Sequence, residues 1–470
     1  MNVNGSAVIK KNDTVIVTIE DMSENGEGIG KSEGYTLFVK DTVIGDRAEV
    51  KIIKAKKTYG YGRIQRLLEP SPWRTEPLCP AAAPCGGCQL QAMSYDQQLK
   101  FKEKKVRDHL ERLGDFQSPP VLPVIGMKDP WHYRNKAQYP VTTDRKGEIV
   151  MGFYAGRTHS VIQTPHCYIG QPVNDRVLAA VKAYMETCGV APYDEASHKG
   201  LVRHVLIRRA AATGQVMVCL IINGKRLPAA EQLTERLLEI EGMTSISYNI
   251  NREKTNVILG EQVVNLYGPG YITDQIGDVS FRISAQSFFQ VNPVQTKVLY
   301  EKALEYAGLQ GEETVWDLYC GAGTISLFLA RKARQVYGVE IVPQAVDNAR
   351  ENARINGIEN VEFYTGKAEE LMPELYRNRR LRADVVVVDP PRKGCAQSLL
   401  DTVIAMAPER MVYVSCNSAT LARDLRYLCD RGFRLEEAQP VDMFPMTVGV
   451  EVVALLSKGE IDSKKVSYIC

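Results

Sequence analysis

A cysteine stands at the junction of a strand-like and a helix-like segment near the end of the chain. The apolar run Met411–Val414 leads into Ser-Cys416-Asn, and a helical stretch, Ser-Ala-Thr-Leu-Ala-Arg-Asp, follows. Free amides and the dipole at a helix start favour a thiolate, so Cys416 is a candidate nucleophile. The competing interpretation is that it is an inert small hydrophobe, and Cys320 and Cys395 are rival nucleophiles.

A carboxylate that could act with this thiolate follows in Val-Gly-Val-Glu451-Val. One reaction that needs both a thiolate and a base is methylation of uracil at C5. This carbon is too weak a nucleophile to take a methyl group from a sulfonium unaided. Addition of a thiolate at C6 gives an enolate whose C5 is nucleophilic. A base must then remove the C5 proton so that the thiolate can leave, and Glu451 can supply that base.

A glycine turn and an acid suggest a nucleoside cofactor. Asp317-Leu-Tyr-Cys-Gly321-Ala-Gly323 ends one expected strand, and Glu340 ends the next. The glycines allow a tight turn and close approach of a ligand, and the acid is expected to bind ribose hydroxyls. Ser326 replaces the third glycine of a dinucleotide fingerprint, which weakens a nicotinamide interpretation. The pattern therefore favours S-adenosylmethionine.

A second acid begins Asp389-Pro-Pro-Arg392-Lys-Gly after another expected strand. The two prolines remove backbone donors and fix the chain at the sheet edge. Methyltransferases that act on exocyclic amines carry a similar motif, usually with an aromatic residue where Arg392 stands. Amine methylation is thus an alternative, and it would not need Cys416.

Three cysteines occur within ten residues, in Cys79-x5-Cys85-Gly-Gly-Cys88. They supply three thiolates from a tight loop, and a fourth ligand must come from elsewhere in the chain. Four thiolates suit either zinc or an iron–sulfur cluster. The C-x3-C-x2-C spacing of radical chemistry on S-adenosylmethionine is absent, so the expected role is structural or RNA-orienting.

The elements that must position these residues change character along the chain. Before residue 70, short strands at Thr14–Ile19, Thr36–Val39 and Ala48–Ile53 predict a small β-barrel. A Pro-rich linker and a charged helix from about Tyr95 to Leu113 follow, and residues 120–285 mix strands and helices. From Thr314 onward, strands and helices alternate, which predicts a doubly wound α/β domain with a largely parallel sheet. In such sheets, ligands bind at the carboxyl ends of strands.

The stretch Lys51–Arg66 holds six basic residues, no acidic residue, and Tyr59 and Tyr61 between them. Cations for phosphates and rings for bases suit single-stranded nucleic acid, although lysines also protect exposed strand edges.

The 470 residues predict about two or three domains. The net charge of +2 is uninformative, and eleven cysteines without an export signal argue against a disulfide framework. No apolar run approaches the roughly 18 residues of a membrane span, so we expect a cytoplasmic protein without membrane contact or an evident obligate protein partner.

Together, Ser-Cys416-Asn, Phe444-Pro445-Met-Thr447 and Glu451 resemble the RNA uracil-5 methyltransferases over nearly the whole chain. The resemblance implies an amino-terminal TRAM RNA-binding barrel (1–67), a central α+β domain with a metal cluster (70–285), a Rossmann-like methyltransferase domain (286–457) and a tail (458–470). Phe289-Gln290-Val-Asn292 matches the motif before the catalytic domain. The implied cofactor-binding residues are Gln290, Tyr319, Glu340 and Asp389.

The same resemblance assigns Cys416 as nucleophile and Glu451 as proton acceptor. The cysteine spacing is similar to that of the ribosomal RNA branch, in which a distant cysteine, here Cys167, completes a [4Fe-4S] site. His166 keeps a zinc site open. We therefore expect methylation of a flipped uridine in 23S ribosomal RNA. A third interpretation is an iron–sulfur or zinc RNA-binding factor with a vestigial methyltransferase fold.

Overall fold

The computed structural model describes residues 9–156, 158–379 and 381–459. The chain forms two compact units. One contains the chain up to Lys105 together with Phe153–Ile162 and Phe444–Gly449, and the other contains Val106–Gly152, Gln163–Met443 and the chain from Val450. Nearly all of the tail expected at 458–470 lies outside the described residues. Within the described ranges, no helix is long and apolar enough to cross a membrane.

The first unit contains a closed five-stranded barrel, in the order β1-β2-β3-β5-β4. Its strands are β1 (Thr14–Met22), β2 (Gly28–Ser32), β3 (Tyr35–Lys40), β4 (Arg47–Ala55) and β5 (Tyr59–Glu69). Alternate side chains fill the interior: Val17, Ile19, Leu37, Val39, Ala48, Val50 and Ile52. A Cβ at Gly62 would lie 2.2 Å from a methyl group of Val50, so β5 passes too close to β4 for a side chain there. The small barrel that the sequence predicts is confirmed.

One carboxylate ties the barrel to the segment that follows it. Asp46 is fully buried and accepts hydrogen bonds from the backbone amides of Val43 (2.7 Å) and Ser71 (2.9 Å). It also pairs with the guanidinium of Arg74, whose Nε lies 3.0 Å from Oδ1. This carboxylate therefore fixes where the chain leaves the barrel. Helix α1 (Tyr95–Arg112) comes later in the chain.

The second unit contains two seven-stranded sheets, apart from residues 153–154 and 161–162 of the first sheet, which belong to the first unit. The first has the order β12-β11-β10-β9-β6-β7-β8. Its strands are β6 (Lys136–Thr143), β7 (Ile149–Tyr154), β8 (Val161–Gln163), β9 (Val202–Arg209), β10 (Val216–Ile222), β11 (Met243–Ile250) and β12 (Gln262–Tyr267). Helices α2 (Val173–Thr187) and α3 (Ala230–Leu238) accompany this sheet, and β13 (Tyr271–Ile276) and β14 (Val279–Ser284) form a separate hairpin.

The second sheet has the order β17-β16-β15-β18-β19-β21-β20. Its strands are β15 (Thr314–Leu318), β16 (Gln335–Glu340), β17 (Val361–Thr365), β18 (Val385–Val388), β19 (Arg410–Ser415), β20 (Phe433–Val441) and β21 (Glu451–Lys458). The first five strands in this order are parallel, and β21 runs antiparallel to both of its neighbours. The expected doubly wound α/β domain is confirmed.

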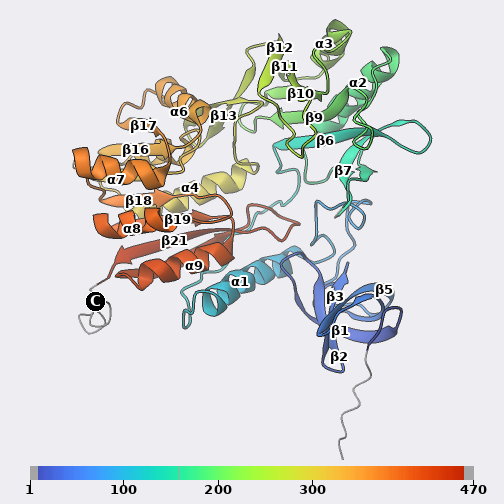
Figure 1. Cartoon of the computed structure of the whole chain (residues 1–470), viewed down its shortest axis with the longest axis horizontal. Helices are drawn as coiled ribbons and strands as arrows, with labels where there is room; N and C mark the ends of the chain where they lie inside the picture. Colours follow the sequence, from blue (N-terminus) through green and yellow to red (C-terminus); the bar gives the residue numbers. More distant parts are fainter. Residues whose placement is uncertain (1–8, 157, 380, 460–470) are drawn as a thin grey trace, which may run out of the picture. The chain divides into compact units, whose positions relative to one another are not determined.

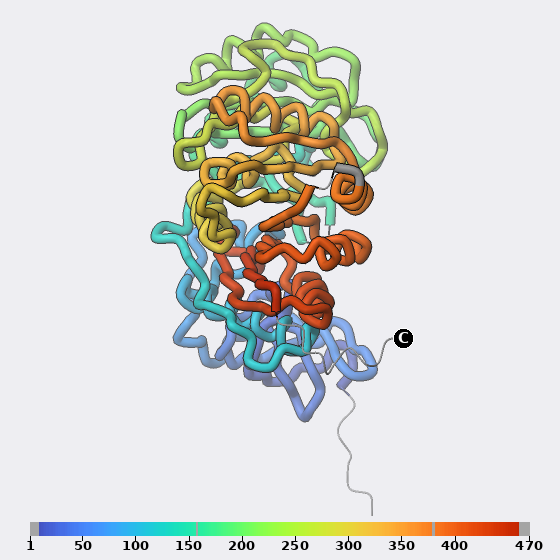
Figure 2. The backbone as a smooth tube through the Cα atoms, turned by 90° about the vertical axis from the view of Figure 1, so that its left-hand side faces the viewer, coloured from blue at the N-terminus to red at the C-terminus, as the bar shows by residue number. Residues whose placement is uncertain are grey.

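Helices cover this second sheet (Figure 1). They are α4 (Pro293–Ala307), α5 (Thr324–Ala330), α6 (Pro343–Ile355), α7 (Ala368–Arg379), α8 (Gln397–Met406) and α9 (Ser418–Cys429). Apolar side chains of α7, α8 and α9 share one buried cluster with strand residues such as Trp316 and Val386. In Figure 2, β9–β12 (green) and β15–β21 (orange to red) form separate layers. The parallel strands therefore present their carboxyl ends at one edge, where ligands bind in such folds.

The sequence did not predict strand β20. Its residues, FRLEEAQPV, contain two adjacent glutamates and a proline, which are unfavourable in a central strand. β20 is the last strand of the sheet, and its outer side bonds only at intervals, to the segment 120–125. Pro440 only accepts there, from the amide of Ile125, so its missing backbone donor is tolerated.

Replacing Asp46 by alanine should lower the free energy of unfolding by about 2–4 kcal/mol, because it leaves the Arg74 guanidinium and two amides without their acceptor. The matched control is Glu69→Ala, which removes an exposed ion pair with Arg47 and should cost less than about 1 kcal/mol. Urea denaturation of the two variants measures the difference. Equal losses of stability in both would contradict the role given to Asp46.

Candidate functional site

The residues that the sequence singles out meet at one edge of the second sheet. Tyr319 follows β15, Glu340 ends β16, Asp389 follows β18 and Cys416 follows β19. Glu451 begins β21, whose next residue, Val452, pairs with Ser415 of β19. Because β21 is antiparallel to β19, its first residue lies at the same edge as the carboxyl ends of the parallel strands.

The turn after β15 is built around positive backbone angles. Tyr319, Gly321 and Gly323 have φ values of +66°, +56° and +77°. A Cβ at Gly323 would lie 2.9 Å from the ring of Phe363, so this glycine is required by both its φ angle and its neighbours. No atom lies within 4 Å of a Cβ built at Gly321, so the backbone there is open to a ligand.

The carboxylate of Glu340 is fixed beside this turn. One of its oxygens accepts a hydrogen bond from the amide of Gly321 (3.1 Å), and the other accepts one from the amide of Val342 (2.9 Å). Two features that the sequence could only propose separately, a glycine turn and an acid, therefore lie in direct contact. Together with the open backbone at Gly321, they fit a nucleoside cofactor.

Asp317 is a buried acid to which the sequence analysis gave no role. It is fully buried at the end of β15, and the hydroxyl of Ser326 donates a hydrogen bond to it. Burial raises the pKa of Asp317 to about 7. Ser326, which stands where a dinucleotide fingerprint has glycine, is thus explained by its bond to Asp317. The signal in the sequence was an acid in an otherwise apolar strand.

The two acids near Cys416, Asp389 and Glu451, have pKa values raised to near neutral pH. Burial raises the pKa of Asp389 to about 7. Burial, followed by the charge of Asp389, raises the pKa of Glu451 to about 8, and the guanidinium of Arg392 opposes this shift. Glu451 is 5% exposed, so its carboxyl group depends on these neighbours rather than on water.

The expected bias of Cys416 toward a thiolate is wrong for the unliganded chain. Burial, and then the charges of Glu451 and Asp389, raise the pKa of the Cys416 thiol to about 11, while Arg392 lowers it. The helix start that was expected to favour the thiolate is present, but burial and the two neighbouring acids shift the pKa in the other direction. The thiol is therefore protonated at neutral pH.

The rival cysteines are less suited to attack a substrate. Cys320 and Cys395 are buried, with 5% and 6% of their surfaces exposed, whereas Cys416 is only partly buried. Burial raises the pKa of Cys320 well above its ordinary value and that of Cys395 to about 12. Accessibility thus favours Cys416.

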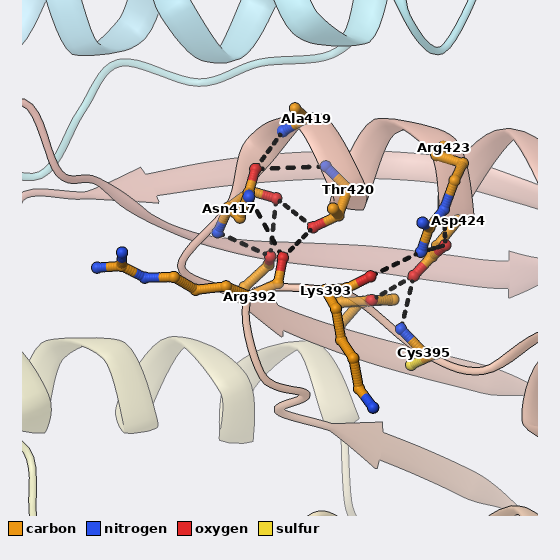
Figure 3. Close-up of polar contacts among 10 residues, drawn as sticks. Arg392, Lys393, Cys395, Asn417, Ala419, Thr420, Arg423 and Asp424 are labelled. Atoms are coloured by element: carbon orange, nitrogen blue, oxygen red, sulfur yellow. Dashed lines mark hydrogen bonds and ion pairs between the residues drawn. The ribbon is translucent and has the colours of Figure 1, made fainter. Parts of the chain in front are cut away.

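Helix α9 holds the loop that follows β18 (Figure 3). Asn417 caps the helix by accepting from the amides of Ala419 and Thr420, and its Nδ2 donates to the carbonyl of Arg392 at 3.3 Å. The hydroxyl of Thr420 donates to the same carbonyl at 3.1 Å, and Arg423 donates to the carbonyl of Lys393 at 3.0 Å. The side chain of Arg392 points away from these contacts.

Asp424 completes this attachment from inside the protein. It is 2% exposed and accepts from the amide of Cys395 (2.9 Å) and from the hydroxyl of Tyr413 in β19 (2.7 Å). One carboxylate therefore connects α9, β19 and the loop after β18. These positioning contacts were invisible in the sequence, because they join residues 11 and 29 positions apart.

Gln290 lies just before α4 and is buried. Its carbonyl accepts a hydrogen bond from the side chain of Asn135 at 3.0 Å. Asn292 caps α4 by accepting from the amide of Gln295, and its Nδ2 donates to the carbonyl of Met443 at 3.0 Å. The motif that the resemblance identified therefore anchors a helix of the second sheet.

The clustered cysteines lie in the first unit. Cys79 is buried, Cys85 and Cys88 are partly buried, and the amide of Gly87 donates to Sγ of Cys85 at 3.4 Å. Burial raises the pKa of the Cys85 thiol. Cys167 belongs to the other unit, and the neighbouring His166 bonds to Asp175 at 2.6 Å. Three cysteines outside any disulfide in one loop fit a thiolate-bound group, yet in the described part of the chain no three His, Cys, Asp or Glu side chains are arranged to hold a metal.

Comparison with known proteins agrees with this geometry. The tRNA (Uracil-5-)-methyltransferase family matches residues 94–459, and the TRAM domain matches residues 10–64. An RNA methyltransferase of Halalkalibacterium halodurans, described as uncharacterized, is 52% identical over 451 residues, covering 96% of this chain and 98% of that protein. A similarly described protein of Clostridium tetani is 49% identical over 450 residues, covering 96% and 97%.

A solved structure is similar over almost its full length. The Pyrococcus abyssi tRNA (uracil-54, C5)-methyltransferase, determined in complex with S-adenosyl-L-homocysteine, superimposes with a TM-score of 0.75 at 27% identity. The match covers 94% of this chain and all of that one. The carboxyl-edge site, the barrel and these matches together show that the chain belongs to the tRNA (uracil-5-)-methyltransferase family, and that it is an RNA methyltransferase with a TRAM domain.

Proposed function

We propose that this enzyme methylates C5 of a flipped uridine in 23S ribosomal RNA, with Cys416 as nucleophile and Glu451 as proton acceptor. The observation that carries this proposal is the pairing of β19 and β21, which brings a partly exposed thiol and a buried carboxyl group to the same edge. Their charges act on each other strongly enough to shift the pKa of the thiol.

The thiol of Cys416 loses its proton to solvent, the thiolate Sγ bonds to C6 of uracil, and the electrons of the C5–C6 double bond move to form an enolate. S-adenosylmethionine would supply an electrophilic methyl group: C5 of the enolate bonds to it as the methyl–sulfur bond breaks, and S-adenosylhomocysteine leaves with that electron pair. Glu451 then takes the C5 proton, the double bond re-forms, and the bond between Sγ and C6 breaks with its electron pair returning to sulfur. With a pKa near 8, Glu451 is a better matched base at neutral pH than an ordinary glutamate.

Cofactor contacts are proposed for the residues around the turn after β15. Glu340 binds the ribose hydroxyls, Tyr319 and Asp389 line the same edge, and Gln290 approaches from the segment before α4. The open backbone at Gly321 and the fixed carboxylate of Glu340 support this assignment.

The barrel supplies RNA contacts. Phe38, Tyr59 and Tyr61 form a cluster with ring centroids 5.6–5.9 Å apart, and Tyr59 is 36% exposed. Basic residues of β4 and β5 flank these rings in the sequence. Rings that can stack on bases beside cations that can contact phosphates suit single-stranded RNA. The choice of ribosomal RNA rests on the cysteine loop and its resemblance to the ribosomal branch.

The covalent step can be trapped with ribosomal RNA fragments that contain 5-fluorouridine, because fluorine cannot leave as a proton does. With S-adenosylmethionine present, mass spectrometry should detect a methylated protein–RNA adduct for the wild-type enzyme and for the matched control Cys188→Ala, but none for Cys416→Ala. Glu451→Gln should slow release of the methylated product at least about 100-fold and leave adducts with ordinary uridine.

Methyl transfer without any adduct would instead favour amine methylation at Asp389-Pro-Pro. Full cofactor binding with neither result would favour a non-catalytic RNA-binding factor.

The charge state of Cys416 can be measured through alkylation by iodoacetamide, followed peptide by peptide. In the unliganded enzyme the rate at Cys416 should rise about tenfold per pH unit above neutrality, because only the thiolate reacts and the pKa is about 11. Glu451 is ionised where the thiol titrates, so Glu451→Gln should shift the profile to lower pH by up to about one unit. Arg392→Gln should shift it to higher pH. Profiles that do not move in these opposite directions would contradict the proposed electrostatic coupling.

We further propose that Cys79, Cys85, Cys88 and Cys167 hold a [4Fe-4S] cluster. The protein purified without oxygen should then contain about four iron atoms per chain and absorb visible light. Cys85→Ala should lose both properties, while Cys188→Ala should retain them. Stoichiometric zinc in place of iron would show that the rival zinc site, with His166 as a candidate ligand, is correct.

A further inference from the structure

The first sheet of the second unit contains an unusual pair of cations. Lys136 of β6 and Arg208 of β9 are directly opposite each other in the antiparallel ladder, so they share one face of the sheet. Like charges in this position destabilise a sheet. Arg208 is only 2% exposed, and Lys136 is partly buried.

The contacts of Arg208 leave its charge uncompensated. One terminal nitrogen donates to the backbone carbonyl of Ser287, and its buried Nε has no hydrogen-bond partner among the residues described. Burial lowers the pKa of this guanidinium to about 10, a direction expected for a charge without an opposite partner. A buried, unpaired charge is costly and is normally retained only where something compensates for it.

Arg134 adds a third positive charge. Burial, then the charges of Arg208 and Arg134, lower the pKa of Lys136 to about 8, and no acidic side chain acts on it. The charge of Asp175 acts on the hydroxyl of Tyr139, on which Arg134 also acts, but the carboxylate of Asp175 bonds to His166. Within the described chain, the three cations therefore lack a counter-charge.

This cation group adjoins the segment that carries Gln290. Asn135, between Arg134 and Lys136, donates its side-chain amide to the carbonyl of Gln290 (3.0 Å) and its backbone amide to that of Val291 (2.9 Å). Its own Oδ1 is buried without a hydrogen-bond partner. The same short segment thus receives contacts from Asn135 and from Arg208, which bonds to Ser287.

We propose that Arg134, Lys136 and Arg208 form a binding site for a backbone phosphate of the RNA substrate, next to the nucleotide that is methylated. The proposal rests on the proposed function, since it names a subsite for the same RNA. A phosphate supplies the missing negative charge to the two partly buried cations, Arg134 and Lys136. The buried positive charge of Arg208 also attracts the phosphate. The carboxylate of the cofactor is the other anion available to such an enzyme. Of the residues proposed to bind the cofactor, Tyr319, Glu340 and Asp389 lie at the edge of the other sheet, and Gln290 lies in the segment that Asn135 contacts.

The test is the salt dependence of RNA binding, because a lost phosphate contact reduces the slope of log affinity against log salt concentration in a way that misfolding does not. Lys136→Gln and Arg134→Gln should each reduce that slope by about 0.7–0.9 and weaken binding most at low salt. Lys136→Arg should restore the slope. Lys146→Gln, in the exposed turn between β6 and β7, is the matched control and should leave it unchanged.

The outcomes separate the possible sources of the anion. Affinity for S-adenosylhomocysteine, measured by calorimetry without RNA, should be unchanged in both glutamine variants. Unchanged salt slopes in both would overturn the proposal, and a loss of S-adenosylhomocysteine affinity would assign the site to the cofactor. The adduct with 5-fluorouridine RNA at saturating concentration should still form, so failure of this inference and failure of the uracil-5 reaction give different results.

Discussion

The buried carboxylate of Asp424 is the contact on which the geometry of the reactive edge depends. It joins the hydroxyl of Tyr413 in β19 to the amide of Cys395 in the loop after β18. Asn417 and Thr420, which precede Asp424 in α9 and its cap, hold the same loop at the carbonyl of Arg392. The backbone that carries Arg392, the cation that acts on both Cys416 and Glu451, is therefore held by a helix whose capping residue directly follows the nucleophile.

Burial and the acids at this edge explain why the thiol of Cys416 is protonated at neutral pH. Asp317, Asp389 and Glu451 are buried acids with raised pKa values, so each is partly or largely protonated near neutrality. Ionising them costs free energy in a desolvated site. A positively charged ligand at this edge favours their ionised forms, so the charge state of the base is coupled to what occupies the site.

Much of this arrangement could be predicted from local sequence. Val385–Val388 reads as a buried parallel strand, and the acids and cysteine placed after such strands had to meet at one edge. The short strand-like segments before residue 70 were enough to predict the barrel. These features depend on residues close together in the chain. The strand order of the doubly wound fold then determines that the loops after the strands meet at one edge.

The remaining features depend on long-range contacts that no local pattern encodes. The pKa of Cys416 is raised by burial and then by the charges of Glu451 and Asp389, which lie 35 and 27 positions away in the chain. Arg208 reaches Ser287 across 79 positions. Edge strand β20 is stabilised by pairing with β21 despite its glutamates and proline. In each case burial or pairing is decided by tertiary structure, which overrides the local preference.

The segment between β14 and α4 connects the two sheets of the second unit. At one end it receives Arg208 and Asn135 of the first sheet. At the other, Asn292 and Gln295 of α4 donate to the carbonyls of Met443 and Asp442, which follow β20 of the second sheet. Gln290 lies between these two sets of bonds. Both ends of the segment are thus held by hydrogen bonds, so the placement of Gln290 depends on contacts from both sheets.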